Sequence, residues 1–403
     1  MSTTERQTPT PETPTAPFTQ PRFRPLVNAF RDLFGRRRDG GGALAVYQHG
    51  EPVVDVWAGY ADVDAGTPWA PDTMAMSFST SKGVTSTLVH RLVQKGVLDL
   101  DVPVATWWPA FAAEGKEDIT LVDILTHRAG LHRIRGVAEA PGDLLDHRRI
   151  AALLAARPPG PERGRPAYHA MTFGYLVAGV VEHATGRDFA DLLAEEVATP
   201  LAADGLYIST PAAEHHRIAP FFQDLSFLGL NMARVGHYLK YARRLRPFVD
   251  ALLPHGFDEF MNSPALWGAV MPAANGVFTA RSLARMYAPL ASGGIFEGER
   301  YLEADVLERA GKVQTRQRDA VLGMPMRWRL GYHQAFVLGS DQPRLGFGHF
   351  GLGGSGAWAD PETRMSIAFT TNRLGMATTP LADVRLARLG AVALECARTP
   401  VSA

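Results

Sequence analysis

Ser79 and Lys82 are the residues of this sequence whose types and spacing most directly suggest chemistry. They occur in the run Ser79-Thr80-Ser81-Lys82, at the start of an amphipathic segment. Residues three apart on a helix share a face, so the lysine amine can point back toward the Ser79 hydroxyl. A serine needs a base to remove its proton, and a lysine with a lowered pKa can serve whereas an arginine cannot. The spacing predicts a nucleophile and its base; a helix-capping serine beside a surface lysine is the alternative.

Tyr168 is a second candidate, in a Tyr-His-Ala run between a proline-rich loop and an apolar helix pattern. A tyrosine at such a junction can reach a site shared with Ser79. Close to Lys82 its phenolate would be stabilised, which would make it a proton relay to the leaving group. An ordinary half-buried tyrosine explains the same residue.

A glycine-rich segment, Gly-His-Phe-Gly-Leu-Gly-Gly-Ser at 348–355, is the third signal. Glycines clustered at a strand let the backbone approach a ligand closely. Backbone amides there could pair with the Ser79 amide as an oxyanion hole. A bulge or turn without a ligand is the alternative.

The apolar pattern places strands at both ends of the chain and helices between them. This order predicts an α/β chain of the α+β type, with an antiparallel sheet built from both chain ends and an inserted helical region. Helices are expected over 25–34, 80–95, 172–185, 188–197, 236–253, 280–291 and 381–397, and strands over 43–47, 53–57, 328–332, 346–350, 357–360 and 365–371. Residues 1–21 are Thr/Pro-rich and are expected to be disordered.

Composition excludes several other classes of protein. The formal net charge of the 403 residues is zero, which leaves no electrostatic footprint for nucleic acid. The single cysteine, Cys396, permits no intramolecular disulfide and fits a small buried residue. No apolar stretch reaches the length of a signal peptide core or a membrane span, so we expect a cytoplasmic protein.

Five segments in order resemble the serine β-lactamase and penicillin-binding-protein superfamily, and within it the family VIII carboxylesterases. They are SFSTSKG, ITLVDILTHRAGL, YHAMTFGYLVAGVVEHATG, PAANGVFTARSLARMYAPLASGG and GHFGLGGSGAWADPE, within residues 40–375. The resemblance implies a β-lactamase-like catalytic domain over 22–403, with its sheet from 22–78 and 277–398 and its helices from 79–276. No metal or organic cofactor is implied.

The same resemblance assigns roles to individual residues. It makes Ser79 the acylated nucleophile, with Lys82 and Tyr168 as the base and the relay. Its third motif places His349, Phe350 and Gly351 along the site, and the amides of Ser79 and Leu352 would form the oxyanion hole.

Two departures from the family pattern bear on the substrate. The third motif of β-lactamases usually begins with a lysine that helps to hold a carboxylate, and here it begins with His349. The second motif usually ends in Asn, and here it ends in Ala170. Both changes weaken recognition of β-lactams and peptidoglycan peptides, so a small uncharged ester is the expected substrate. The alternatives are a β-lactamase, D-aminopeptidase or DD-peptidase on the same machinery, or a non-catalytic scaffold.

Other conspicuous residues carry weaker signals. Ser355 lies in an incomplete G-x-S-x-G pattern between strands, and no histidine pair has metal-ligand spacing. His127 is expected to belong to a structural turn. Residues 209–270 mix aromatic groups with arginines and form either helical packing or a lid.

Overall fold

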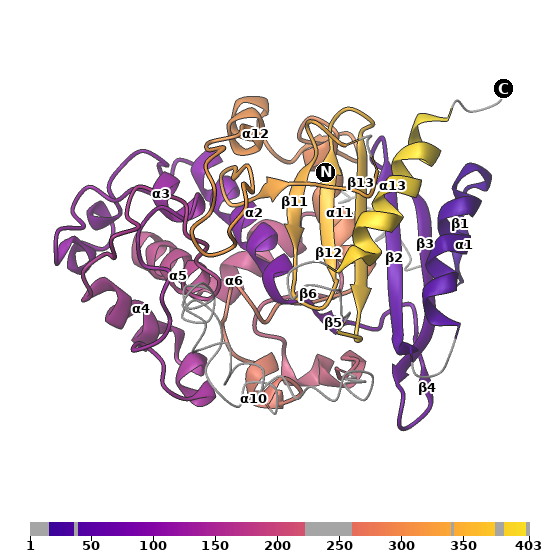
Figure 1. Ribbon diagram of the computed structural model, residues 1–403, viewed down its shortest axis with the longest axis horizontal. Coiled ribbons are helices and arrows are strands. Elements are labelled where there is room, and N and C mark those ends of the chain that lie inside the picture. Colours follow the sequence, from indigo (N-terminus) through magenta and orange to yellow (C-terminus); the bar gives the residue numbers. More distant parts are fainter. Residues whose placement is uncertain (1–15, 36–38, 222–259, 340–341, 375–382, 400–403) are drawn as a thin grey trace, which may run out of the picture.

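The backbone is organised around one antiparallel sheet. The computed structural model describes residues 16–35, 39–221, 260–339, 342–374 and 383–399. Within these residues the strand order of the sheet is β1-β3-β2-β13-β12-β11-β10, with β4 paired to β3 (Figure 1). Its strands are β1 (Phe18–Thr19), β2 (Gly41–Gln48), β3 (Glu51–Asp62), β4 (Thr67–Pro68), β10 (His333–Gln334), β11 (Phe347–Phe350), β12 (Gly356–Asp360) and β13 (Met365–Thr371).

The two ends of the chain meet at the centre of this sheet. β13 pairs with β2 over its full length, from Met365 opposite Gln48 to Thr371 opposite Gly42. Every residue of β2 is buried, which requires cover on both faces of the sheet. Leu44 on β2 packs into a different apolar cluster from its neighbours in sequence, because successive side chains of a strand point to opposite faces.

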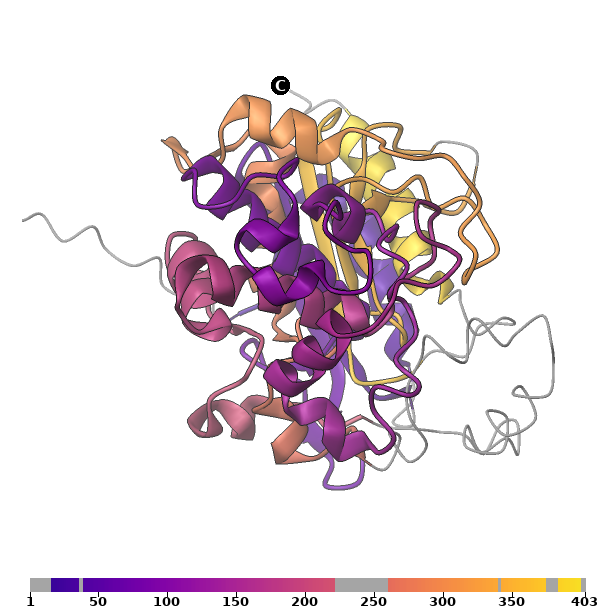
Figure 2. The ribbon, with the colours of Figure 1, turned by 90° about the vertical axis from the view of Figure 1, so that its left-hand side faces the viewer.

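Helices supply that cover. The described helices are α1 (Arg24–Arg31), α2 (Ser81–Gln94), α3 (Leu121–Leu125), α4 (His147–Ala155), α5 (Thr172–Thr185), α6 (Phe189–Leu193), α10 (Pro264–Trp267), α11 (Ala280–Ala291), α12 (Ala304–Gly311) and α13 (Val384–Arg398). Helices α1 and α13 pack together over one face, and α11 packs against β2, β12 and β13 from the other. Helices α2 to α6 form a second part beside the sheet (Figure 1), and this part lies in front of the sheet in Figure 2.

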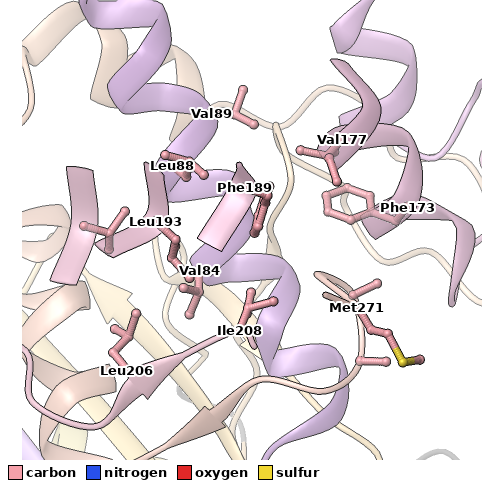
Figure 3. Close-up of a cluster of buried hydrophobic side chains, with 14 of the residues drawn as sticks. Val84, Leu88, Val89, Phe173, Val177, Phe189, Leu193, Leu206, Ile208 and Met271 are labelled. Carbon is pink, nitrogen blue, oxygen red and sulfur yellow. The ribbon is translucent and has the colours of Figure 1, made fainter. Parts of the chain in front are cut away.

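The second part has its own apolar core around α2 and α5. Val84 and Leu88 of α2 meet Phe173 and Val177 of α5, with Phe189 of α6 beside them (Figure 3). Short strands join this part to the sheet. They are β5 (Ala75–Met76), β6 (Leu206–Tyr207) and β7 (Val277–Phe278), which pair in the order β5-β7-β6, and a hairpin of β8 (Ile295–Phe296) and β9 (Glu299–Arg300).

Most of the predicted elements are found. The helices expected over 172–185 and 280–291 have those bounds, and the 43–57 hairpin and the last two strands are confirmed. The helix expected over 236–253 and most of the region 209–270 lie outside the described residues. The buried position of Cys396 is confirmed.

Two predictions are wrong. Residues 328–332 are not a strand, because Gly331 adopts a positive φ of 84° and turns the chain there. The expected disorder up to residue 21 is wrong for Phe18–Thr19, which pair with β3 as β1. Among the described residues, none of the helices has the length and apolar character needed to cross a bilayer.

Candidate active site

Ser79 lies in a short 3-10 turn, η4 (Phe78–Thr80), that leads directly into α2. The residue before it, Phe78, has a φ of 45°, in the left-handed region that a bulky residue rarely adopts. Such strain is retained where the surrounding structure fixes it, commonly at functional sites. The first turn of α2 has no side-chain cap, so the alternative of a helix-capping Ser79 is wrong.

Lys82 is fully buried, which also excludes the surface lysine of that alternative. Its Nζ lies 3.0 Å from Ser79 Oγ and donates hydrogen bonds to the carbonyl oxygens of Ala170 (2.6 Å) and Ala273 (2.9 Å). Burial holds the pKa of Lys82 well below its usual value. A neutral amine has two hydrogens and one lone pair. In that neutral form, donation of both hydrogens to the two carbonyls would leave the lone pair facing Ser79 Oγ.

Tyr168 completes the group around Ser79. Its hydroxyl donates a hydrogen bond to Ser79 Oγ at 2.7 Å, and its ring lies 4.9 Å from Lys82 Nζ. Burial raises the pKa of Tyr168 above its ordinary value of 10.0. Burial therefore favours the neutral phenol in the resting state, and a phenolate stabilised by Lys82 stays a prediction.

Asp319 and Trp328 hold Tyr168 in place, and neither belongs to a motif that the sequence analysis identified. Asp319 Oδ1 accepts a hydrogen bond from the Tyr168 amide at 3.1 Å, and its Oδ2 accepts one from Trp328 Nε1 at 3.1 Å. The Trp328 ring stacks on the Tyr168 ring, with centroids 5.6 Å apart and planes within 10°. The contact joins residues 151 positions apart, which no local pattern could reveal.

The third predicted segment forms the opposite wall. Gly351, at the end of β11, lies so close to the turn before Ser79 that a Cβ there would come within 2.2 Å of the Ser77 carbonyl oxygen. The Gly351 amide donates to the Ser355 carbonyl at 2.8 Å. The next amide, that of Leu352, has no hydrogen-bond acceptor among the described residues and is free to meet a substrate oxygen.

His349 lines the same wall but does not contact Ser79. Its Nδ1 lies 3.0 Å from the Phe350 carbonyl oxygen, so Nδ1 carries the proton of the neutral ring. Its Nε2 is buried and has no hydrogen-bond partner among the described residues. Burial, with the neighbouring His333 and Lys82, keeps the pKa of His349 well below its usual value. The wall therefore offers a neutral acceptor where a lysine would offer a cation.

These residues open onto a cavity of about 1020 Å³. That volume is at the upper end for a small-molecule site, and large apolar side chains dominate the lining. Ser79, Tyr168 and His349 all line it.

The remaining motif residues have structural roles. Ser355 is buried, and its Oγ accepts a hydrogen bond from the Thr371 amide at 3.1 Å, which ties β12 to β13. His127 Nδ1 accepts a hydrogen bond from the His169 amide at 3.2 Å, as a structural turn requires. No group of three or more potential ligand side chains that could hold a metal ion is found in the part of the chain that the structure describes.

A serine hydroxyl between a buried neutral amine and a phenol, at the edge of an antiparallel sheet, defines a serine hydrolase. The chain belongs to the beta-lactamase family, whose model matches residues 26–391.

Relatives within this family include named esterases. The sequence is 43% identical to the esterase/beta-lactamase LipL of Mycobacterium tuberculosis over 363 residues, which cover 88% of this chain and 82% of that protein. The fold is similar to that of a family VIII carboxylesterase, with a TM-score of 0.82 and 32% identity over 94% of this chain and 98% of the other. A penicillin-binding protein homologue from Caulobacter crescentus gives a TM-score of 0.80 at the same identity and coverage.

Proposed function

We infer that the protein is a carboxylesterase that forms an acyl intermediate on Ser79. The observation that carries this proposal is the convergence on Ser79 Oγ of Lys82 Nζ at 3.0 Å and the Tyr168 hydroxyl at 2.7 Å. The esterase names of the relatives support it. The domain bounds 22–403, the cytoplasmic location and action without a cofactor stay predictions.

The proton path follows from these contacts. The Lys82 lone pair accepts the Ser79 proton as Oγ bonds to the ester carbonyl carbon. The amides of Ser79 and Leu352 stabilise the negative oxygen that forms. The alcohol oxygen then leaves and takes a proton from the Tyr168 hydroxyl, which Lys82 reprotonates. In the second half, a water molecule gives one proton to Lys82 as its oxygen bonds to the acyl carbon. The bond between the acyl carbon and Ser79 Oγ then breaks, and Oγ takes a proton back from the same pair, which releases the acid.

An ester suits the reacting end of this site better than a β-lactam. A neutral imidazole at His349 offers no charge to a carboxylate, and Ala170 has no side-chain amide to bind an acylamide. Losing one charge-assisted hydrogen bond costs about 1.5 to 3 kcal/mol. Acyl transfer itself needs only the nucleophile, its base and the oxyanion hole, all of which an ester can use.

Labelling with a fluorophosphonate probe tests the proposal. The probe should modify Ser79, located by peptide mass spectrometry, and the Ser79→Ala variant should lose both labelling and ester hydrolysis. The matched control is Ser355→Ala, which removes the other serine of the site region and should remain active. Loss of activity in Ser355→Ala, with activity kept in Ser79→Ala, would reverse the assignment.

Hydrolysis of β-lactams is the second candidate, favoured by the double name of the Mycobacterium tuberculosis relative. We expect kcat/KM for a short-chain aryl ester to exceed that for nitrocefin by at least about a hundredfold, the combined size of the two losses. Comparable values on one preparation would favour the β-lactamase instead.

A further inference from the structure

Most of the charged side chains that line the site cavity are positive. Arg316, Arg327 and Arg344 line it, and none of them forms an ion pair with another described residue. The one carboxylate among the described residues of the lining, Asp383, is paired with Arg385 at 2.6 Å. A cleft lined by uncompensated charge of one sign concentrates ligands of the opposite sign.

A buried guanidinium strengthens this field. Arg329 is only 1% exposed, and its Nη1 is buried without a hydrogen-bond partner among the described residues. Burial, followed by the charges of Arg327 and Arg316, lowers the pKa of Arg329 to about 10. Its Nη2 donates a hydrogen bond to Gln334 Oε1 at 2.9 Å, and Gln334 lines the cavity, so the Arg329 guanidinium lies directly behind the cavity wall.

The backbone of Arg327 is also strained. Its φ is 50°, in the left-handed region. The next residue is Trp328, whose ring stacks on Tyr168. Arg327 is therefore the sequence neighbour of a residue that packs on Tyr168, beside Ser79.

The same cavity wall is apolar between the charges. Met324, Phe336 and Leu352 line the cavity and remain 49%, 37% and 36% exposed, which is unusual for large apolar groups that lie together. Met326 and Phe350 also line it. An apolar cavity with cations among its lining residues matches a ligand that is apolar along most of its length and anionic at one point.

We propose that the substrate is an amphiphilic ester whose acyl chain lies along the apolar wall and whose anionic group, a carboxylate or a phosphate, is bound by Arg316 and Arg327. This inference rests on the proposed esterase function and changes one part of it. His349 offers no cation to an anionic group near the reacting carbonyl, but the arginines can bind one farther along the substrate.

Matched chromogenic esters test the charge. The anionic members are 3-octanoyloxy-4-nitrobenzoate and 3-octanoyloxy-4-nitrophenyl phosphate, and the neutral member is the carboxamide of the first. We expect kcat/KM for at least one anionic ester to exceed that for the carboxamide by about tenfold or more, the size of one charge-assisted hydrogen bond. The better anion identifies the natural group. The preference should shrink in about 1 M NaCl, where charges are screened within roughly 3 Å.

A paired set of variants tests the residues. In Arg316→Gln/Arg327→Gln the ratio of anionic to neutral kcat/KM should fall close to one. The control, Arg24→Gln/Arg31→Gln, removes the same charge from exposed positions of α1 that form no ion pair with described residues. Because both substrates are measured on one preparation, the ratio does not depend on the folded fraction.

Equal rates with charged and neutral esters in the wild-type enzyme would overturn the proposal, and so would a preference that survives in the double variant. Failure of the esterase function itself looks different. In that case none of the three octanoyl esters is hydrolysed, or Ser79→Ala hydrolyses them as the wild type does.

Discussion

Lys82 and Lys116 are both fully buried, in two different regions of the molecule. The side-chain amine of each lysine lies among backbone carbonyl oxygens. Lys116 Nζ donates hydrogen bonds to the carbonyl oxygens of Ala113 and Arg157, just as Lys82 donates to two carbonyls. Burial is the largest influence on both lysines and lowers the pKa of each.

The two regions differ in what stands beside the amine. The Tyr168 ring lies 4.9 Å from Lys82 Nζ, closer than the Phe173 ring at 6.0 Å, whereas the ring beside Lys116 Nζ is that of Phe111, at 5.6 Å. The Lys82 amine faces the Ser79 hydroxyl, but no hydroxyl of a described residue is hydrogen-bonded to Lys116. Burial and carbonyl partners thus prepare an amine to be neutral. The hydroxyl beside Lys82 offers that amine a proton to accept, whereas Lys116 has no such neighbour among the described residues.

The largest expected effect separates the two lysines directly. Lys82→Arg should lower kcat/KM for an ester by roughly a thousandfold or more, because a guanidinium stays protonated and cannot take the Ser79 proton. Lys116→Arg should leave turnover per folded molecule close to wild type. Steady-state kinetics, normalised by near-UV circular dichroism, measures both. Similar losses in the two variants would mean that Lys82 acts only through packing.

Tyr168→Phe makes the ring beside Lys82 the same as the ring beside Lys116. We expect kcat to fall by roughly a hundredfold or more, since the leaving alcohol loses its proton donor. KM should change little, because the ring and its stacking on Trp328 remain. An ester with a very acidic leaving group needs no proton and should lose less. If the loss is the same for acidic and ordinary alcohols, Tyr168 is not the relay.

Asp319→Asn tests whether catalysis requires Asp319 to hold Tyr168 in place. Asn keeps the acceptor for the Tyr168 amide but presents a donor to Trp328 Nε1, so the stacked pair should shift and kcat should fall by about tenfold to a hundredfold. The charge of Asp319 raises the pKa of Tyr168, so its removal lowers that pKa. The alkaline limb of the pH–kcat profile should therefore move to lower pH.

The matched control for that variant is Asp360→Asn, which removes another fully buried carboxylate, on β12. It should leave the alkaline limb where it is in the wild type. A shift of equal size in both variants would assign the effect to general loosening of the fold.

The smallest expected effect is on how stability depends on pH, and both lysines should show it. Because the pKa of Lys82 is lower in the folded chain, the unfolded chain binds more protons below pH 10.5, and the free energy of unfolding rises with pH up to that value. Lys82→Met removes this dependence. Its Tm relative to wild type should increase as pH falls, by about 1 to 2 °C per pH unit above the folded pKa.

Lys116→Met should change Tm with pH in the same direction and by less, while keeping turnover. Thermal melts from pH 7 to pH 10 would measure both. A Tm difference that does not vary with pH would show that the buried lysine is charged.

The sequence predicted the parts of the site that are local. Ser79 and Lys82 lie three residues apart on one helix face, so their contact follows from helical geometry. The helix over 280–291 could also be predicted, because a threonine caps it and its apolar face is continuous. The wrong prediction of a strand over 328–332 also rests on a local pattern. The apolar residues of this segment predict a strand, whereas the structure buries them where the chain turns at Gly331.

The parts that the sequence could not predict depend on distant contacts. Asp319 looks like any loop carboxylate until the fold places its oxygens against Tyr168 and Trp328. The raised pKa of Tyr168 likewise depends on how deeply the fold buries its own hydroxyl. The arginines beside the cavity are a few among the many in this chain, and only their common position distinguishes them.

The pairing of β2 with β13 also constrains how the enzyme is made. Ser79 is synthesised long before the strand that completes the sheet, and before Gly351 and Leu352 of the opposite wall. Until β13 arrives, β2 has one unpaired edge, which can pair with another unfinished chain. Contacts this far apart in sequence form slowly. In the proposed mechanism a nascent chain therefore has Ser79 without the Leu352 amide, and we expect hydrolysis to begin only when the C-terminal strands have been released and paired.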